Sequence, residues 1–73
     1  MQPELTEILT DVLETRGISE QDSAKTIPSW DSVRHLTLIT AIEERFDVTF
    51  DADQLMELTS VAAIVEALRK QGR

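Results

Sequence analysis

The feature that most constrains this 73-residue sequence is a helical apolar pattern that begins directly behind a serine, in the stretch Trp30–Phe46. Large apolar residues recur there at about 100° per residue, which predicts a helix with one buried face. The buried face holds Leu38, Ile39, Ile42 and Phe46. The opposite, exposed face holds Ser32, Val33, Leu36, Thr40, Glu43 and Glu44. We therefore expect the hydroxyl of Ser32 to point outward from the first turn.

The two residues that open this helix suit an anion. Asp31 is a short acidic residue of the kind that caps helices, and Ser32 falls on the first turn, where backbone N–H groups lack intrahelical partners. Those N–H groups and the positive end of the helix dipole both favour a phosphate. The residues alone leave two interpretations open: an exposed hydroxyl at a position that suits a phosphate, or a serine that merely caps the helix.

The first segment of the chain also has helical spacing. Pro3 is tolerated in a first turn, and Glu4 and Glu7 complement the helix dipole there. The apolar residues that follow the i, i+3, i+4, i+7, i+8 rule are Leu5, Ile8, Leu9, Val12 and Leu13. Arg16 and Gly17 predict the C-terminal stop, because a basic last turn and a residue able to adopt positive φ are typical of helix ends.

Two non-helical connections flank the central helix. Residues 18 to about 31 are mostly polar and predict a long ordered loop. The apolar residues that we expect to hold this loop on the core are Ile18, Ile27 and Trp30. Residues 47–50 alternate polar with apolar side chains, which predicts a short extended link with Val48 and Phe50 turned inward.

The C-terminal third of the chain predicts two more helices. Asp51 is expected to cap a helix of about two turns, with Gln54 completing an approximate capping box. The core-facing residues of this short helix are Leu55 and Leu58. Thr59 or Ser60 then caps a last helix, whose apolar residues are Val61, Ile64, Val65 and Leu68 and whose closing residues are Arg69, Lys70 and Gly72. The sequence therefore predicts an all-α fold: a small four-helix bundle, three main helices plus one short helix, with a long loop between helices one and two.

Composition narrows the function. A chain of this length predicts one domain, residues 1–73, with too little volume for a large enclosed active site. The absence of cysteine excludes disulfides and thiolate chemistry, and the 4% aromatic share predicts an aliphatic core. A net charge of −7 argues against nucleic acid and for basic protein partners. No apolar run approaches the roughly 20 residues of a membrane span, so we expect a cytoplasmic protein, free-standing or excised from a larger synthase.

The motif Asp31-Ser32-Val33, followed by this helix, resembles the Asp-Ser-Leu attachment motif of the acyl carrier protein family. The helix spacing, the long loop, the Glu-Glu-x-Phe-Asp ending at residues 43–47 and the short third helix match the family pattern in order over nearly the whole chain. The resemblance implies that Ser32 carries a 4′-phosphopantetheine arm through a phosphodiester, with acyl groups held as thioesters on the terminal thiol. It also implies a carrier that is not itself an enzyme.

The same resemblance assigns roles to neighbouring residues. Asp31 resembles a family residue that helps to bind the magnesium ion of the phosphopantetheinyl transferase, a cation that prefers oxygen ligands. The same aspartate could cap the helix as well. The residues that the resemblance assigns to partner docking are Val33, Leu36, Glu43 and Glu44. The wider acidic margin, which doubles as a solvated face, holds Glu43, Glu44, Asp47, Asp51, Asp53 and Glu57. The implied partners are the transferase and acyl-loading, condensing and other acyl-processing enzymes. We expect the carrier itself to be monomeric.

Other chemistry has weaker support. His35 lies three residues after Ser32, but a hydrolase dyad also needs an orienting group, oxyanion donors and a pocket, so we expect a half-buried histidine at the edge of the core and no catalytic residues. Trp30 is expected to pack the loop against the helix start, with contact to the arm as the alternative. The acids between Asp47 and Asp53 lack the glycine and terminal glutamate of a Ca²⁺ loop, so no metal site is predicted.

Three alternatives concern what the carrier does. The resemblance implies a fatty-acid-like, polyketide or other specialised biosynthetic pathway. Val33, Arg34, His35 and Thr37 depart from the residues usual in fatty-acid carriers, which favours polyketide or other specialised acyl chemistry. A peptidyl or aminoacyl carrier would have the same fold and the same arm. A helical interaction module with an unmodified Ser32 is the alternative from a different class.

Overall fold

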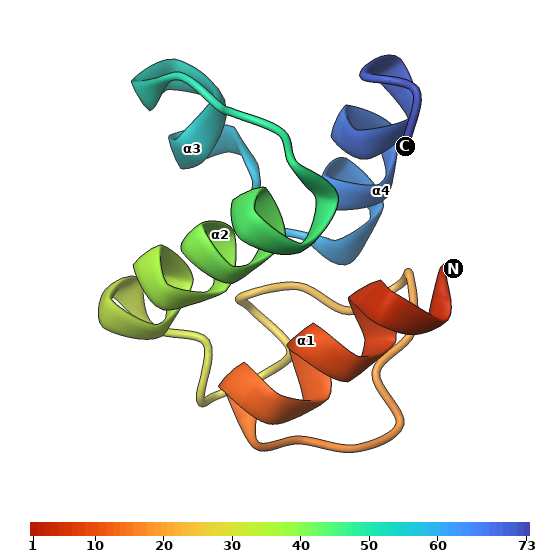
Figure 1. Ribbon diagram of the computed structural model, residues 1–73. Helices are drawn as coiled ribbons and strands as arrows, with labels where there is room; N and C mark the ends of the chain where they lie inside the picture. The colour runs from red at the N-terminus through yellow and green to blue at the C-terminus, as the bar shows by residue number, and fades with distance from the viewer.

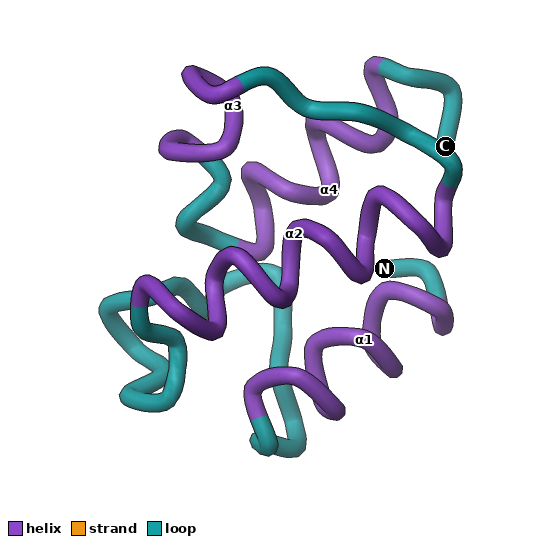
Figure 2. Tube along the Cα trace, turned by 60° about the vertical axis from the view of Figure 1, so that its left-hand side comes forward, coloured by secondary structure: helices purple, strands orange, loops and turns teal.

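The computed structural model describes residues 1–73 and contains four helices, α1 (Pro3–Leu13), α2 (Ser32–Phe46), α3 (Ala52–Glu57) and α4 (Val61–Lys70). α1 packs directly against α2, while α3 and α4 lie on the other side of α2 (Figure 1). A long loop joins the end of α1 to the start of α2 (Figure 2). The predicted all-α fold, with three main helices and one short helix, is confirmed.

The core is entirely apolar. Its buried residues come from α1, α2, α4 and the segments that connect the helices, and no polar or charged residue is buried among them. The helical residues with no exposed surface include Leu9, Leu13, Leu38, Ile42, Val61 and Ile64. The predicted buried face of α2 is confirmed, since Leu38, Ile39, Ile42 and Phe46 are all buried. Aliphatic burial is therefore the main source of stability in this small protein.

α1 begins at Pro3 as predicted but ends earlier than Gly17. Its last residue is Leu13, and Glu14 takes the left-handed conformation with φ 50°. Arg34 of α2 contacts this end of α1: its guanidinium donates to the Val12 carbonyl at 2.6 Å and pairs with the Glu14 carboxylate at 2.7 Å. The Val12 carbonyl at the end of α1 therefore accepts a hydrogen bond from a side chain of the neighbouring helix, which is a tertiary contact. The expectation that Arg16 and Gly17 end the helix was wrong.

The long loop is ordered by the core and by its own hydrogen bonds. Ile18, Ile27 and Trp30 are all buried, as predicted. The Asp22 carboxylate accepts from the Ser19 N–H and the Thr26 hydroxyl, both at 2.9 Å. These two hydrogen bonds lower the pKa of Asp22 below its usual value, and the bond from the Ser19 backbone has the larger effect.

The loop also pairs with the chain before α4, which the sequence pattern does not indicate. Ser23 and Ser60 form an isolated antiparallel bridge. On either side of it, the Ala24 N–H donates to the Thr59 carbonyl at 2.9 Å and the Val61 N–H donates to the Asp22 carbonyl at 3.0 Å. These bonds place the middle of the loop beside the start of α4.

The capping predictions for α3 and α4 hold. Asp51 and Gln54 form a reciprocal capping box at the start of α3, and Ser60, rather than Thr59, caps α4 through the Ala63 N–H. Leu58 is buried, but Leu55 is only partly covered. Val48 and Phe50 point inward from the extended link, as predicted.

The longest helix, α2, has 15 residues, and none of the four helices combines the length and apolar character needed to cross a membrane.

Candidate functional site

Ser32 is the first residue of α2 and is exposed, as predicted. The residue before it, Asp31, is the N-cap: its carboxylate accepts from the Arg34 N–H at 2.9 Å. The cap is therefore supplied by Asp31, and the Ser32 side chain takes no part in it. A serine at this position is free for another use.

The hydroxyl of Ser32 differs from those of the other four serines in the chain. Ser29 donates to the Leu13 carbonyl at 2.6 Å, and Ser60 accepts from the Ala63 N–H at 3.1 Å. Ser23 accepts from the Lys25 N–H, and Ser19 bonds within its own turn. Ser32 alone makes no side-chain hydrogen bond inside the protein. Its oxygen is accessible, as predicted, and is also free of internal hydrogen bonds, which the sequence pattern does not indicate.

The backbone around Ser32 presents hydrogen-bond donors. The His35 N–H bonds to the Asp31 carbonyl at 2.8 Å, and the Arg34 N–H is taken by the Asp31 carboxylate. The N–H groups of Ser32 and Val33 have no partner within the chain. Free donors at the positive end of a helix favour an oxyanion, so a phosphate attached to this serine would be stabilised here.

A groove of about 280 Å³ opens beside Ser32. Its walls come from the long loop, the first turns of α2, and α3 with the residues after it: Ala24, Trp30, Asp31, Ser32, His35, Met56 and Thr59. Met56, which lies in this wall, is 78% exposed. An exposed hydroxyl, free N–H donors and an adjoining groove together fit a phosphate-linked organic arm on Ser32.

His35 is a half-buried residue at the edge of the core, as predicted, and is fully engaged. Its Nδ1 accepts from the Trp30 indole N–H at 3.0 Å, and its Nε2 bonds to the Leu55 carbonyl at 2.8 Å. No bond joins His35 to Ser32, so the pair is not a nucleophile and base. Trp30 is buried and packs the loop against the start of α2, as expected.

The residues expected to dock partners divide into two groups. Val33 and Leu36 are 72% and 55% exposed, and Glu44 is also exposed. Glu43 is half-buried, because the chain turns back at Asp47 and brings the Phe50 N–H to within 2.8 Å of its carboxylate. Glu43 therefore lies outside the buried face, as expected, but is only partly exposed. Its carboxylate accepts a hydrogen bond from the turn after α2.

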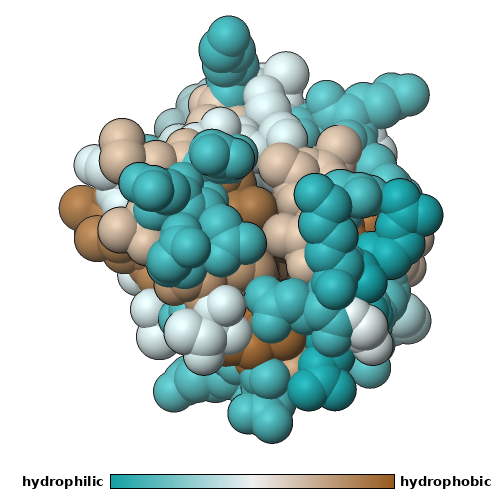
Figure 3. All heavy atoms as spheres, turned by 90° about the horizontal axis from the view of Figure 1, so that it is seen from above, coloured by the Kyte–Doolittle hydropathy of each residue, from teal (hydrophilic) through white to brown (hydrophobic).

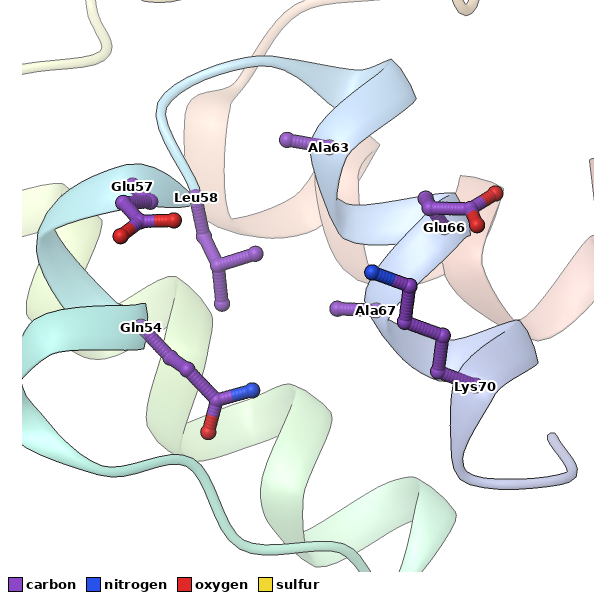
Figure 4. Close-up of a pocket in the computed structure, with 7 residues that line it drawn as sticks. All are labelled: Gln54, Glu57, Leu58, Ala63, Glu66, Ala67 and Lys70. Carbon is purple, nitrogen blue, oxygen red and sulfur yellow. The ribbon is translucent and has the colours of Figure 1, made fainter.

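A second cavity, of about 230 Å³, lies between α3 and α4 and is separate from Ser32 (Figure 4). Its lining residues are Gln54, Glu57, Leu58, Ala63, Glu66, Ala67 and Lys70. The face above α3 and α4 is mostly hydrophilic and is interrupted by small apolar patches (Figure 3). No group of three or more histidine, aspartate or glutamate side chains is placed to hold a metal ion.

Comparisons with known proteins agree with this geometry. The family described as a phosphopantetheine attachment site matches residues 30–68, which include Ser32 and all of α2 and α3. The solution structure of holo acyl carrier protein from Geobacter metallireducens superposes with a TM-score of 0.80 at 28% identity, covering 94% of this chain and 85% of that one. No curated protein sequence matches the chain significantly.

The chain belongs to the phosphopantetheine attachment site family. Its fold and its structural match identify it as a domain of the acyl carrier protein type, with 4′-phosphopantetheine as the prosthetic group. Such a domain is a carrier and not a catalyst, and it interacts with acyl-processing enzymes. The family resemblance found in the sequence is confirmed.

Proposed function

We propose that Ser32 is the attachment residue, and that this protein carries acyl intermediates as thioesters between the enzymes of a biosynthetic pathway. The single observation that supports this most strongly is the state of the Ser32 hydroxyl, which is exposed, free of internal hydrogen bonds and placed at the start of α2. The arm supplies a terminal thiol for acyl groups, while residues 1–73 act as one monomeric carrier domain in the cytoplasm.

Loading requires the Ser32 oxygen to form a bond to the β-phosphorus of coenzyme A while the bond from that phosphorus to the bridging oxygen of the pyrophosphate breaks. Adenosine 3′,5′-bisphosphate leaves, and the serine proton passes to a base on the transferase. An exposed hydroxyl on the first turn of a rigid helix can enter another protein's active site without unfolding its own domain. Incubation with coenzyme A, Mg²⁺ and a broad-specificity phosphopantetheinyl transferase is expected to add one phosphopantetheinyl mass. An unmodified chain with every transferase tried would contradict the proposal.

Asp31 has a second role in this proposal, as an oxygen ligand for the transferase's magnesium. The Asp31→Asn variant keeps a side-chain oxygen that can cap α2 but loses the negative charge. We expect kcat/KM of loading to fall by about tenfold or more, equivalent to roughly 1.4 kcal/mol, with a thermal midpoint close to wild type. Transferase kinetics and thermal melting measure the two effects.

The Asp31→Ala variant is the matched comparison. It removes both the charge and the capping oxygen, and should lose about 1 kcal/mol of stability as well as loading rate. Wild-type loading by Asp31→Asn would show that the aspartate only caps the helix.

The docking surface in this proposal is formed by Val33, Leu36, Glu43 and Glu44, with Glu44 supplying the freer charge. Charge reversal in Glu44→Lys should slow association with a basic partner enzyme several-fold at low salt, because complementary charges mainly set association rates. The difference should shrink at high salt. Stopped-flow binding to the transferase at two ionic strengths measures it.

Glu4→Lys is the matched control, because it changes the same charge on α1 in an equally exposed position. Equal slowing by both variants would assign the effect to net charge and would contradict a docking surface on α2.

The pathway is proposed to be polyketide or other specialised acyl chemistry. Two of the residues behind this idea serve the fold: Arg34 contacts the end of α1, and His35 joins Trp30 to α3. The proposal therefore depends on Val33 and Thr37 alone. A mass spectrum of the protein taken from its own cell, with the cargo still attached, distinguishes an acyl group from an aminoacyl one.

A further inference from the structure

α3 is weakly attached to the rest of the protein. None of its six residues is fully buried, and Leu55 is only partly covered. Its start is held by its own capping box, which is a local interaction. A short helix with little buried apolar surface has low local stability, so each tertiary bond to it matters. Such a bond comes from His35 of α2.

The bond from His35 satisfies a helix-end carbonyl. The Leu55 carbonyl lies in the last turn of α3, which ends at Glu57, and no backbone N–H bonds to it. The His35 Nε2, at 2.8 Å, is its partner. Carbonyls at helix C-termini need such an external donor, and here another helix supplies it.

The bond from Trp30 indicates the tautomer of His35. An indole N–H can only donate, so the Nδ1 that receives it at 3.0 Å must carry no proton. The imidazole proton is then on Nε2, where it donates to the Leu55 carbonyl. The Trp30 and His35 rings also stack, with centroids 6.1 Å apart and planes at 27°. Loop, α2 and α3 are thus joined through one neutral imidazole.

We propose that this chain of bonds is a latch, and that His35 is a positioning residue that holds α3 in place beside Ser32. The latch residues Trp30 and His35 line the groove next to Ser32, and α3 contributes Met56 to the same groove. The latch therefore sets the shape of the surface that a partner enzyme meets around the reacting hydroxyl. This consequence for loading rests on the proposed function of Ser32, but the latch itself does not.

The first test is amide hydrogen exchange in the His35→Phe and His35→Gln variants. Phenylalanine keeps an aromatic ring but makes neither bond, whereas glutamine can accept from Trp30 and donate to Leu55. We expect the α3 amides of His35→Phe to exchange about fivefold faster than in the wild type, with the α2 core amides unchanged, and His35→Gln to restore protection. Unchanged α3 exchange, or equal acceleration throughout the protein, would overturn the latch.

The second test uses the wild-type chain and needs no substitution. The ¹⁵N shifts of the His35 ring should show the tautomer with its proton on Nε2, because Nδ1 accepts from the Trp30 indole N–H. Ring nitrogen shifts of the tautomer with its proton on Nδ1 would overturn the assignment.

The functional consequence is read from loading kinetics. In His35→Phe the hydroxyl of Ser32 keeps its place on α2, so kcat should stay within about twofold of wild type. KM should rise about threefold, because α3 without the latch no longer holds Met56 and the groove beside Ser32 in the arrangement that the transferase meets. His35→Gln should recover the wild-type KM. A wild-type KM in a variant with faster α3 exchange would overturn the positioning role, whereas loading of Ser32→Ala would overturn the proposed function instead.

Discussion

Ser32→Ala is expected to abolish phosphopantetheine loading completely while leaving the fold intact. The variant removes only the hydroxyl, which makes no hydrogen bond inside the protein, and the N-cap of α2 stays with Asp31. The thermal midpoint should therefore stay within about 2 °C of wild type, as for a surface substitution of less than about 0.5 kcal/mol. Intact-mass measurement after incubation with coenzyme A and transferase gives the loading, and circular dichroism gives the midpoint.

Ser29→Ala is the matched control for this result. The Ser29 hydroxyl donates to the Leu13 carbonyl at 2.6 Å, at the end of α1. The control should lose about 1 kcal/mol of stability but load normally. Loading of Ser32→Ala would remove Ser32 as the attachment residue. A large loss of stability in Ser32→Ala would show that the hydroxyl has a structural role that the geometry does not assign to it.

Leu38→Ala is expected to remove most of the stability of the fold. Leu38 has no exposed surface and lies on the buried face of α2. A buried leucine truncated to alanine costs about 3 kcal/mol, through lost burial and the cavity left behind. A domain of this size holds only about 5 kcal/mol in total. The thermal midpoint should fall by about 15 °C or more, measured by circular dichroism.

Leu36→Ala provides the comparison, with the same chemical change two residues away. Leu36 is 55% exposed and belongs to the proposed docking surface. Its truncation should cost less than about 0.5 kcal/mol. Similar melting of the two variants would contradict the assignment of buried and exposed faces on α2.

The local features of the fold could be read from the sequence because each depends on residues close together in the chain. The spacing of Leu38, Ile39 and Ile42 predicts which side of α2 is buried. Asp51 and Gln54 predict a capping box that the structure contains. These signals act within one or two helical turns, so no knowledge of the tertiary arrangement is needed.

The features that the sequence pattern did not predict involve contacts that reach outside a single helix. The end of α1 is contacted by Arg34, which lies 22 residues after the Val12 carbonyl that it binds. The partial burial of Glu43 depends on how the chain returns after Asp47 to present the Phe50 N–H. Local signals cannot show such contacts, because they exist only once the helices have packed.

The candidate site could be predicted in part, because some of its signals lie close together in the sequence. Asp31 and Ser32 mark a helix start, and the family motif supplies the prosthetic group. The uncommitted state of the Ser32 hydroxyl became visible only against the hydrogen bonds of the other four serines. The link from Trp30 through His35 to α3 likewise needed the positions of three separate segments.

Attachment of the arm to Ser32 is tested most directly by fragmenting the loaded wild-type chain in a mass spectrometer. The added mass should appear on every fragment that contains Ser32 and on no fragment that contains only other serines. Those other serines, Ser19, Ser23, Ser29 and Ser60, serve as internal controls. Localisation of the mass to any of them, or to another residue, would contradict Ser32 as the attachment residue.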